Sequence, residues 1–355
     1  MVGAIEMSTL NLAERLARPE LLNLEPYQSA RRIGGRGDIW INANESPFNR
    51  TELARLNRYP ECQPPELIEA YSKYSKVPAA NIVCGRGADE AIELLIRAFC
   101  VPGRDSIAIF GPTYGMYSIS AKTFNVGVNA LSLTEDYALP ADVSGVKGCK
   151  LVFICNPNNP TGTVLSVERI EQVLQQLPEQ LVVVDEAYIE FCPEYSVANL
   201  LASYPNLVIL RTLSKAFALA GARCGFLMAN TDVINIIMLV IAPYPVPLPV
   251  STLAVNALSD AGISNMLADV ELLKAQGKRL GDALTELGAN VVPSGANFLL
   301  AYFDDVATVS NGLKEAGIVA RAYRDPRLVD AIRFSFTNEA ETNQIIAVLR
   351  NILNK

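Results

Sequence analysis

The sequence predicts an α/β fold in which a mostly parallel sheet is flanked by helices, followed by a smaller α+β domain. Between about residues 80 and 230, short apolar runs alternate with helical patterns. These runs are continuously apolar, which is typical of strands that are covered on both faces. After residue 242 a proline-rich connection leads to a long helical stretch and then to further short strands. We therefore expect an N-terminal arm over 1–38 that joins the small domain, a large domain over 39–265, and a small C-terminal domain over 266–355.

The large domain contains six predicted strands with helical segments between them. The apolar runs that predict the strands are 81–85, 106–110, 150–155, 180–184, 207–210 and 225–229. Segment 88–99 shows the spacing of an amphipathic helix, because Ile92, Leu95, Ile96 and Phe99 fall on one helical face.

The small domain follows the connection APYPVPLPV (242–250), whose prolines oppose a helix. The pattern over 251–287 predicts one long helix. The segments ANFLLAYF (296–303) and AIRFSFT (331–337) predict antiparallel strands, and 339–353 predicts a terminal helix.

The composition excludes several functional classes. The 30 basic and 37 acidic residues give a net charge of −7, which opposes nucleic-acid binding. We expect no membrane span, because no apolar run reaches the required length, and no signal peptide, because the acidic N-terminus lacks an apolar core. Seven cysteines without a CxxC pair indicate reduced thiols and a cytoplasmic protein.

The chain contains no histidine. This absence removes Ser-His and Cys-His catalysis and every histidine-ligated metal mechanism. Acid–base chemistry must therefore use Lys, Tyr, Asp, Glu or a cofactor.

Polar motifs follow four of the predicted strands. They are GRGADE (85–90), NPNNPTG (156–162), DEAY (185–188) and RTLSKAFALAGARCG (211–225). Alone, each has an ordinary explanation, such as a turn, a helix cap at Asp185 or a solvated Lys215. Together, in this order, with Arg223 eight residues after Lys215, they are far more specific. Because ligands bind beyond the carboxyl ends of parallel strands, we expect these motifs to form one site.

This order of motifs resembles the fold type I aminotransferases that depend on pyridoxal 5′-phosphate (PLP), over essentially the whole chain. Further segments are similar to the histidinol-phosphate aminotransferase family: EPYQSARR (25–32), INANESPF (41–48), NRYPECQP (57–64), PTYGMY (112–117) and DEAYIEFCP (185–193). The resemblance implies a large domain with a seven-stranded type of sheet. It also implies transamination between L-histidinol phosphate and 2-oxoglutarate, which yields imidazole-acetol phosphate and glutamate in histidine biosynthesis.

The resemblance also implies roles around the cofactor ring. Lys215 would carry PLP as an imine and then move the substrate proton, which requires a lowered lysine pKa. Asp185 would pair with the pyridine nitrogen and keep the ring electron-poor. Tyr188 and Asn159 would hydrogen-bond the 3-hydroxyl oxygen, and Tyr114 would stack on the ring.

The phosphate of PLP needs donors and positive charge. The helix that begins at Ala88 offers free backbone N–H groups, from Ala88 and Asp89. The carboxylate of Asp89 is expected to point away from the phosphate and to cap this helix. Ser214 and Arg223 would complete the cup, with Thr212 a weaker candidate.

Two residues near the N-terminus belong to the same expected site. In the family, a tyrosine of the NRYP segment reaches the phosphate from the neighbouring subunit; here it is Tyr59, so the resemblance implies a homodimer with shared active sites. Asn44 is expected to line the pocket, although this chain has NESP where the family often has NENP.

The amino donor and acceptor both carry anions. Arg333 matches the family arginine that binds the substrate carboxylate or phosphate, bidentately where geometry permits. Arg321 and Tyr27 are the next candidates, and Arg324 and Arg327 remain open alternatives to Arg321 because this segment matches the family only loosely.

Three other functions compete with this interpretation. An aromatic or broad-specificity aminotransferase and a phospho-amino-acid decarboxylase would share the same fold and cofactor. A PLP-fold effector domain of a transcription regulator would need an added DNA-binding module, for which the roughly 40 residues before the motifs leave no room, and the acidic charge also opposes it.

Overall fold

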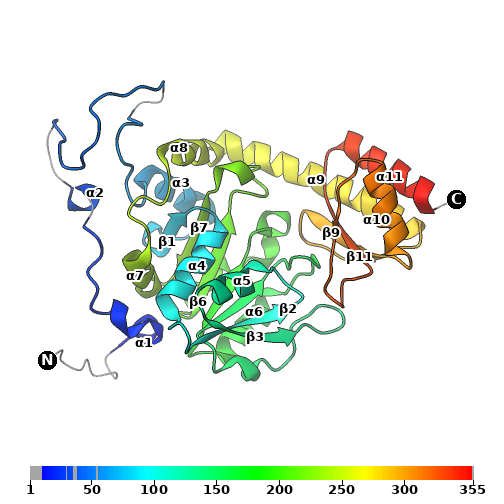
Figure 1. The fold of residues 1–355 in the computed structure, drawn as a ribbon, viewed down its shortest axis with the longest axis horizontal. Helices are drawn as coiled ribbons and strands as arrows, with labels where there is room; N and C mark the ends of the chain where they lie inside the picture. The colour runs from blue at the N-terminus through cyan, green and yellow to red at the C-terminus, as the bar shows by residue number, and fades with distance from the viewer. Residues whose placement is uncertain (1–9, 29, 35–37, 53–54, 354–355) are drawn as a thin grey trace.

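A computed structural model describes residues 10–28, 30–34, 38–52 and 55–353 of the chain (Figure 1). The expected arm over 1–38 therefore lies partly outside the described residues. No helix in these ranges is long and apolar enough to cross a membrane.

A seven-stranded sheet forms the centre of the larger part of the molecule, with the order β1-β7-β6-β5-β4-β2-β3. Only β7 runs opposite to the others, because it is antiparallel to both β1 and β6. The expected mostly parallel sheet is thus confirmed. The strands are β1 (Ile82–Gly85), β2 (Ser106–Gly111), β3 (Gly127–Ser132), β4 (Leu151–Cys155), β5 (Leu181–Asp185), β6 (Leu207–Thr212) and β7 (Gly225–Ala229).

Helices cover both faces of this sheet, as the continuously apolar strands predict. Within β4, Val152 and Ile154 pack with one group of helices, whereas Leu151 and Phe153 pack with the other. The first face carries α3 (Pro65–Ser75), α6 (Val167–Gln176) and α8 (Leu248–Ala257); the second carries α1 (Leu12–Leu16), α4 (Ala88–Phe99), α5 (Met116–Thr123) and α7 (Thr231–Val240).

A four-stranded antiparallel sheet forms the smaller C-terminal part, with the order β10-β11-β9-β8. Its elements are β8 (Asn290–Val292), β9 (Phe298–Tyr302), β10 (Arg321–Ala322), β11 (Ala331–Ser335), α10 (Val306–Glu315) and α11 (Glu339–Leu353). In Figure 1 the long helix α9 (Asp260–Glu286) runs from the neighbourhood of α8 to this second sheet. The two antiparallel strands and the terminal helix that the sequence predicts are confirmed.

One prediction of secondary structure is wrong, and three strands, β3, β8 and β10, were not predicted. The single helix over 251–287 is two helices, because α8 ends at Ala257 and Ser259 caps α9 by accepting a hydrogen bond from Gly262 N at 3.1 Å. Strand β3 has no counterpart among the predicted strands. It lies at the sheet edge and is only partly buried, so its sequence lacks a continuous apolar run.

The described part of the N-terminal arm begins on the body and then leaves it. Ala13, Leu16 and Leu21 are buried against the helices of the second face. Figure 1 shows the chain beyond α1 as an extended segment that projects from the body and includes the short helix α2 (Ala30–Ile33). Large apolar side chains of this segment are exposed: Leu24, Tyr27, Ile33, Ile39, Ile41, Phe48, Leu56 and Tyr59.

Candidate active site

The carboxyl ends of the parallel strands meet at one edge of the large sheet, and β7 begins there because it runs in the opposite direction. Gly225 pairs in register with Gly85 of β1 and with Thr212 of β6, so the loop that precedes β7 lies at the same edge. A cavity of about 510 Å³ opens at this edge. The four polar motifs of the sequence therefore meet around one cavity, as their positions after strands predict.

Twelve of the residues predicted for the site line this cavity: Ala88, Asp89, Tyr114, Asn159, Asp185, Tyr188, Thr212, Ser214, Lys215, Arg223, Arg321 and Arg333. The structure does not bring Tyr27, Asn44 or Tyr59 to the cavity wall. Tyr27 is 68% exposed, and Asn44 is also exposed. Tyr59 stacks on Tyr244 with ring centroids 4.4 Å apart and remains half exposed.

Asp185 ends β5 and lies buried beneath the cavity. Its Oδ2 accepts a hydrogen bond from Tyr117 Oη at 2.6 Å, and its Oδ1 accepts one from Ala187 N at 3.1 Å. Burial raises the pKa of Asp185 to about 6, and the hydrogen bond from Tyr117 opposes this rise. No ion pair joins Asp185 to a cation in the described ranges. Among the described residues this buried carboxyl group is therefore not ion-paired, and the cation of Lys215 acts on it only at a distance.

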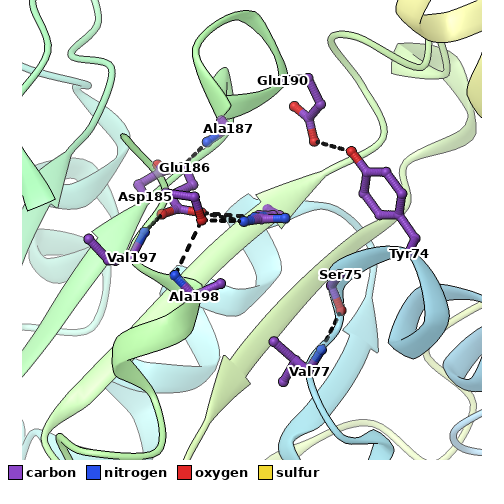
Figure 2. A network of polar contacts seen from close by, with 11 residues as sticks. Tyr74, Ser75, Val77, Asp185, Glu186, Ala187, Glu190, Val197 and Ala198 are labelled. Atoms are coloured by element: carbon purple, nitrogen blue, oxygen red, sulfur yellow. Dashed lines mark hydrogen bonds and ion pairs between the residues drawn. The ribbon is translucent and has the colours of Figure 1, made fainter. Parts of the chain in front are cut away.

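The next residue, Glu186, faces away from the cavity. Figure 2 shows it paired with a guanidinium group, that of Arg211, whose Nη2 lies 2.8 Å from Glu186 Oε2. Glu186 also accepts a hydrogen bond from Val197 N at 2.7 Å. The side chains of Asp185 and Glu186 thus lie on opposite faces of the sheet, where Asp185 contacts Tyr117 and Glu186 pairs with Arg211.

Lys215 follows β6 and is partly buried in the cavity. Its Nζ lies 5.3 Å from the centroid of the Tyr188 ring. Burial lowers the pKa of Lys215, the nearby cation of Arg333 lowers it further, and Asp185 acts in the opposite direction. The pKa of Lys215 is thus lowered, as expected for a lysine that forms an imine, and this favours the neutral amine that a nucleophile or base needs.

The N-terminus of α4 forms an anion cradle at one end of the cavity. Gly87 is its N-cap, with φ 87° and no side-chain cap, so the first N–H groups of α4 face outward. A Cβ atom on Gly87 would lie 2.9 Å from Arg223 Nη2, so glycine leaves room for this guanidinium group. Arg223 Nη1 donates to Ser214 Oγ at 3.4 Å, and Thr212 Oγ1 donates to the same oxygen at 2.9 Å.

The prediction that Asp89 caps α4 is wrong. Asp89 lies inside the first turn, after the cap position, and makes no capping hydrogen bond. Its Oδ2 instead accepts from Arg223 Nη2 at 3.0 Å, and its Oδ1 accepts from Tyr114 Oη at 2.9 Å. Asp89 therefore fixes a cation of the cradle and an aromatic ring of the cavity wall.

The small sheet contributes the opposite wall. Arg333 on β11 donates from Nη1 to Asn159 Oδ1 at 2.6 Å, and Asn159 Nδ2 donates to Tyr188 Oη at 3.2 Å. Arg321 on β10 is the register partner of Arg333, so two guanidinium groups face one cavity. Within the described residues, neither Arg333 Nε nor the buried hydroxyl of Tyr323 has a hydrogen-bond partner. This wall therefore presents the positive charge of two guanidinium groups to an anion in the cavity.

Of the three candidate arginines in the loosely matching segment, Arg321, Arg324 and Arg327, only Arg321 lines the cavity. Arg327 donates to Leu133 O at 2.9 Å and lies over the Tyr137 ring, away from the cavity wall. Arg324 is exposed and does not line the cavity. Arg321 is thus the arginine placed beside Arg333.

The sequence did not predict Tyr117, which lies beneath the cavity, or eight of the residues that line it. Those eight are Thr113, Gly115, Met116, Ile119, Cys155, Pro160, Ala187 and Tyr323. Tyr117 stands three residues after Tyr114 in PTYGMY, which is the spacing of neighbours on one helix face. That spacing could have indicated that Tyr117 lies near Tyr114 and therefore near the site. The eight lining residues carry no comparable signal; Ile119, for example, lies within α5 (Met116–Thr123) among other apolar and small residues.

Comparison with known proteins agrees with this geometry. The family of class I and II aminotransferases matches residues 38–349. A histidinol-phosphate aminotransferase of Shewanella oneidensis is 65% identical, and the alignment covers 98% of this chain and 91% of that protein. The chain belongs to the histidinol-phosphate aminotransferases, within the class I and II aminotransferase family.

Solved structures show the same fold. The histidinol-phosphate aminotransferase of Clostridium acetobutylicum aligns with a TM-score of 0.77 and 27% identity, over 84% of this chain and 91% of that one. That of Sinorhizobium meliloti, solved in complex with PLP, aligns with a TM-score of 0.76 and 24% identity over 83% of each chain. The fold is thus fold type I, and the cofactor of this aminotransferase is PLP.

The residues of the cavity fit PLP. The buried carboxyl group of Asp185, without a cation of its own, suits the protonated ring nitrogen. The anion cradle of α4 and Arg223 suits the phosphate. Lys215, partly buried with a lowered pKa, suits attachment to the aldehyde carbon.

Proposed function

We propose that this chain transfers the amino group of L-histidinol phosphate to 2-oxoglutarate at the described cavity, yielding imidazole-acetol phosphate and glutamate. The observation that supports this most strongly is the pairing of a reactive lysine with an arginine wall in one cavity. Lys215 and Asp185 lie among the strand ends, whereas Arg321 and Arg333 face them from the small sheet.

The protein residues divide the chemistry among them. Bound PLP supplies an electron-accepting ring and a carbon that carries the amino group between the two substrates. The amine of Lys215 removes the proton from the substrate Cα, because burial and Arg333 keep a neutral amine accessible. Asp185 would hold the ring nitrogen protonated, Tyr188 and Asn159 would hydrogen-bond the ring oxygen, and Tyr114 would pack on the ring.

The arginine wall selects both substrates. A guanidinium group pairs through two N–H groups with either a phosphate or a carboxylate, so one wall accepts histidinol phosphate and then the distal carboxylate of glutamate. Arg333 is the main contact and Arg321 assists it.

A donor panel tests the reaction. Purified enzyme loaded with PLP is assayed with 2-oxoglutarate and histidinol phosphate, histidinol, phenylalanine, tyrosine or phosphothreonine, and glutamate and CO₂ are both measured. We expect the highest kcat/KM for histidinol phosphate, with glutamate formed and no CO₂ from any donor. Higher kcat/KM with the aromatic amino acids, or CO₂ released from phosphothreonine, would contradict the proposal in favour of one of the other two PLP activities.

We further propose that the enzyme is a homodimer in which Tyr59 contributes to the phosphate site of the partner subunit. The extended arm supports this, because it exposes many apolar side chains that a second copy would cover. Tyr59 itself is half exposed and outside the cavity of its own chain.

We also retain the proposed division into an arm over 1–38, a large domain over 39–265 and a small domain over 266–355. The two separate sheets support it, although the boundary after 265 falls within α9. We place the enzyme in the cytoplasm, since all seven cysteines are buried thiols.

A further inference from the structure

Tyr117 and Asp185 form a buried pair directly beneath the cavity. Tyr117 is fully buried on α5, and its ring stacks on Phe153 with centroids 4.8 Å apart. Its hydroxyl donates to Asp185 Oδ2 at 2.6 Å, which is the short distance of a charge-assisted hydrogen bond. The packing of the Tyr117 ring thus fixes the direction from which Asp185 accepts this hydrogen bond.

The direction of donation follows from burial. Burial raises the pKa of Tyr117 well above its usual range, so the hydroxyl keeps its proton and can only donate to the carboxylate. A hydrogen bond donated to a carboxylate favours its ionised form. Burial acts on Asp185 in the opposite direction, because it favours the neutral acid.

Other ionisable groups surround Asp185 and must be considered with Tyr117. They come from every neighbouring element: Asp89 on α4, Tyr114 before α5, Cys155 at the end of β4, Tyr188 after β5 and Lys215 after β6. Asp89 raises the pKa of Asp185 and Lys215 lowers it, but both act at a distance, whereas Tyr117 is in direct contact.

We propose that Tyr117 is a positioning residue that holds Asp185 ionised and oriented toward the ring nitrogen of PLP. This inference rests on the proposed role of Asp185 as the partner of that nitrogen. Without Tyr117, Asp185 would take up a proton at a higher pH, and a neutral acid could no longer hold the ring nitrogen protonated.

Ligand binding as a function of pH tests the proposal without relying on turnover. The probe is pyridoxamine 5′-phosphate, which has the same ring nitrogen as PLP but forms no bond to Lys215. Its dissociation constant for the apoenzyme is measured between pH 5 and 8 for the wild type and for Tyr117→Phe. Below the pKa of Asp185 binding must expel a proton, so affinity falls as the solution becomes more acidic.

In Tyr117→Phe we expect this acidic loss of affinity to begin at a pH higher by about one unit, the effect of losing one hydrogen bond to a charged group. The matched control is Tyr74→Phe, which removes a tyrosine hydroxyl that donates to buried Glu190 at 3.3 Å on the other face of the sheet. The control should leave the pH dependence unchanged. An unshifted profile in Tyr117→Phe would overturn the inference.

Asp185→Asn separates this inference from the role of Asp185. It should reduce the acidic loss of affinity to the part that protonation of the probe's own phosphate at about pH 6 causes, and a loss as large as in the wild type would mean that Asp185 is not the ring partner. If Tyr117→Phe does not fold, 3-fluorotyrosine at position 117 replaces it. This residue is a stronger donor of nearly the same size, so it should move the acidic loss to lower pH, and an unchanged or opposite shift would contradict the proposal.

Discussion

Arg333 shows how one side chain can determine substrate choice. Its Nη1 is held by Asn159 at 2.6 Å, while its buried Nε has no partner among the described residues. The guanidinium group is therefore oriented at the cavity wall by Asn159, and its planar fork can pair with an anionic substrate there.

Arg333→Ala should lower kcat/KM for histidinol phosphate by two to three decades, about 3–4 kcal/mol, because the phosphate loses its main charge partner. For histidinol, which lacks the phosphate, kcat/KM should fall much less. The matched control is Arg324→Ala, which removes an exposed arginine that does not line the cavity. It should leave kcat/KM unchanged for both substrates. An equal loss for histidinol and histidinol phosphate would indicate a structural role for Arg333.

Much of the cavity could be predicted from sequence, because its residues follow strands whose ends must meet. Lys215, Asp185 and Arg223 belong to this group. Tyr117 could not be predicted from such a signal, since it lies inside a helix and its position beneath Asp185 depends on how α5 packs. Tyr59 could not be placed in the cavity either, and the expectation that it serves a neighbour stays a prediction.

At the scale of elements, a buried ion pair joins the ends of β5 and β6 behind the cavity. Arg211 Nε donates to Glu186 Oε2 at 2.9 Å, and Arg211 Nη2 donates to Ser196 Oγ at 2.7 Å. Figure 2 shows these contacts gathered around Glu186. The strand that ends at Asp185 and the strand that precedes Lys215 are thus tied together on the face opposite to the cavity.

Glu186→Gln should lower the free energy of unfolding by about 3–5 kcal/mol, because it leaves the cation of Arg211 buried without a counter-charge. Chemical denaturation measures this loss. Glu179→Gln is the control, because it breaks a surface ion pair between Glu179, whose side chain is 66% exposed, and Arg15. It should lower the free energy of unfolding by less than about 1 kcal/mol. Similar small losses in both variants would contradict the account of this pair.

Glu190, on the same face, should make stability depend on pH. Burial raises its pKa from 4.5 to about 7, and its Oε2 has no hydrogen-bond partner among the described residues. Because the folded-state pKa is raised, the stabilising contribution is complete below about pH 4.5 and is lost as the pH rises through 7.

Glu190→Gln removes this titration and keeps the shape of the side chain. The free energy of unfolding of the wild type, minus that of the variant, should therefore fall by about 2–3 kcal/mol between pH 5 and pH 8. Urea denaturation of both proteins at several pH values measures the difference. Parallel pH profiles would show that Glu190 does not titrate in this range.

The elements that sequence could not predict have identifiable physical reasons. The break between α8 and α9 depends on Gly262, where a Cβ atom would lie 2.4 Å from Ala257 O, so the helices approach closely without a proline or a polar loop to mark the turn. The apolar spacing simply continues across it. Strand β3 is an edge strand with partly exposed side chains, and only its pairing with β2 identifies it as a strand.

At the scale of the whole molecule, the arm and the exposed Tyr59 predict active sites shared between two subunits. Tyr59→Phe should weaken PLP retention, and mixing it with the inactive Lys215→Ala chain should restore one site per heterodimer. That site has Lys215 from one chain and Tyr59 from the other. PLP retention and activity of the mixture are compared with each variant alone. No gain after confirmed subunit exchange would mean that Tyr59 does not serve the partner's site.

The most direct test of the central claim is to identify the lysine that binds PLP. The holoenzyme is reduced with borohydride and digested, and the modified peptide is identified by mass spectrometry. The account predicts that the PLP mass lies on Lys215, whose pKa is lowered in the cavity, and that Lys215→Ala carries no reduced adduct while keeping its fold. A stable adduct on another lysine of the wild type, or one that persists in Lys215→Ala, would contradict the assignment of this cavity as the active site.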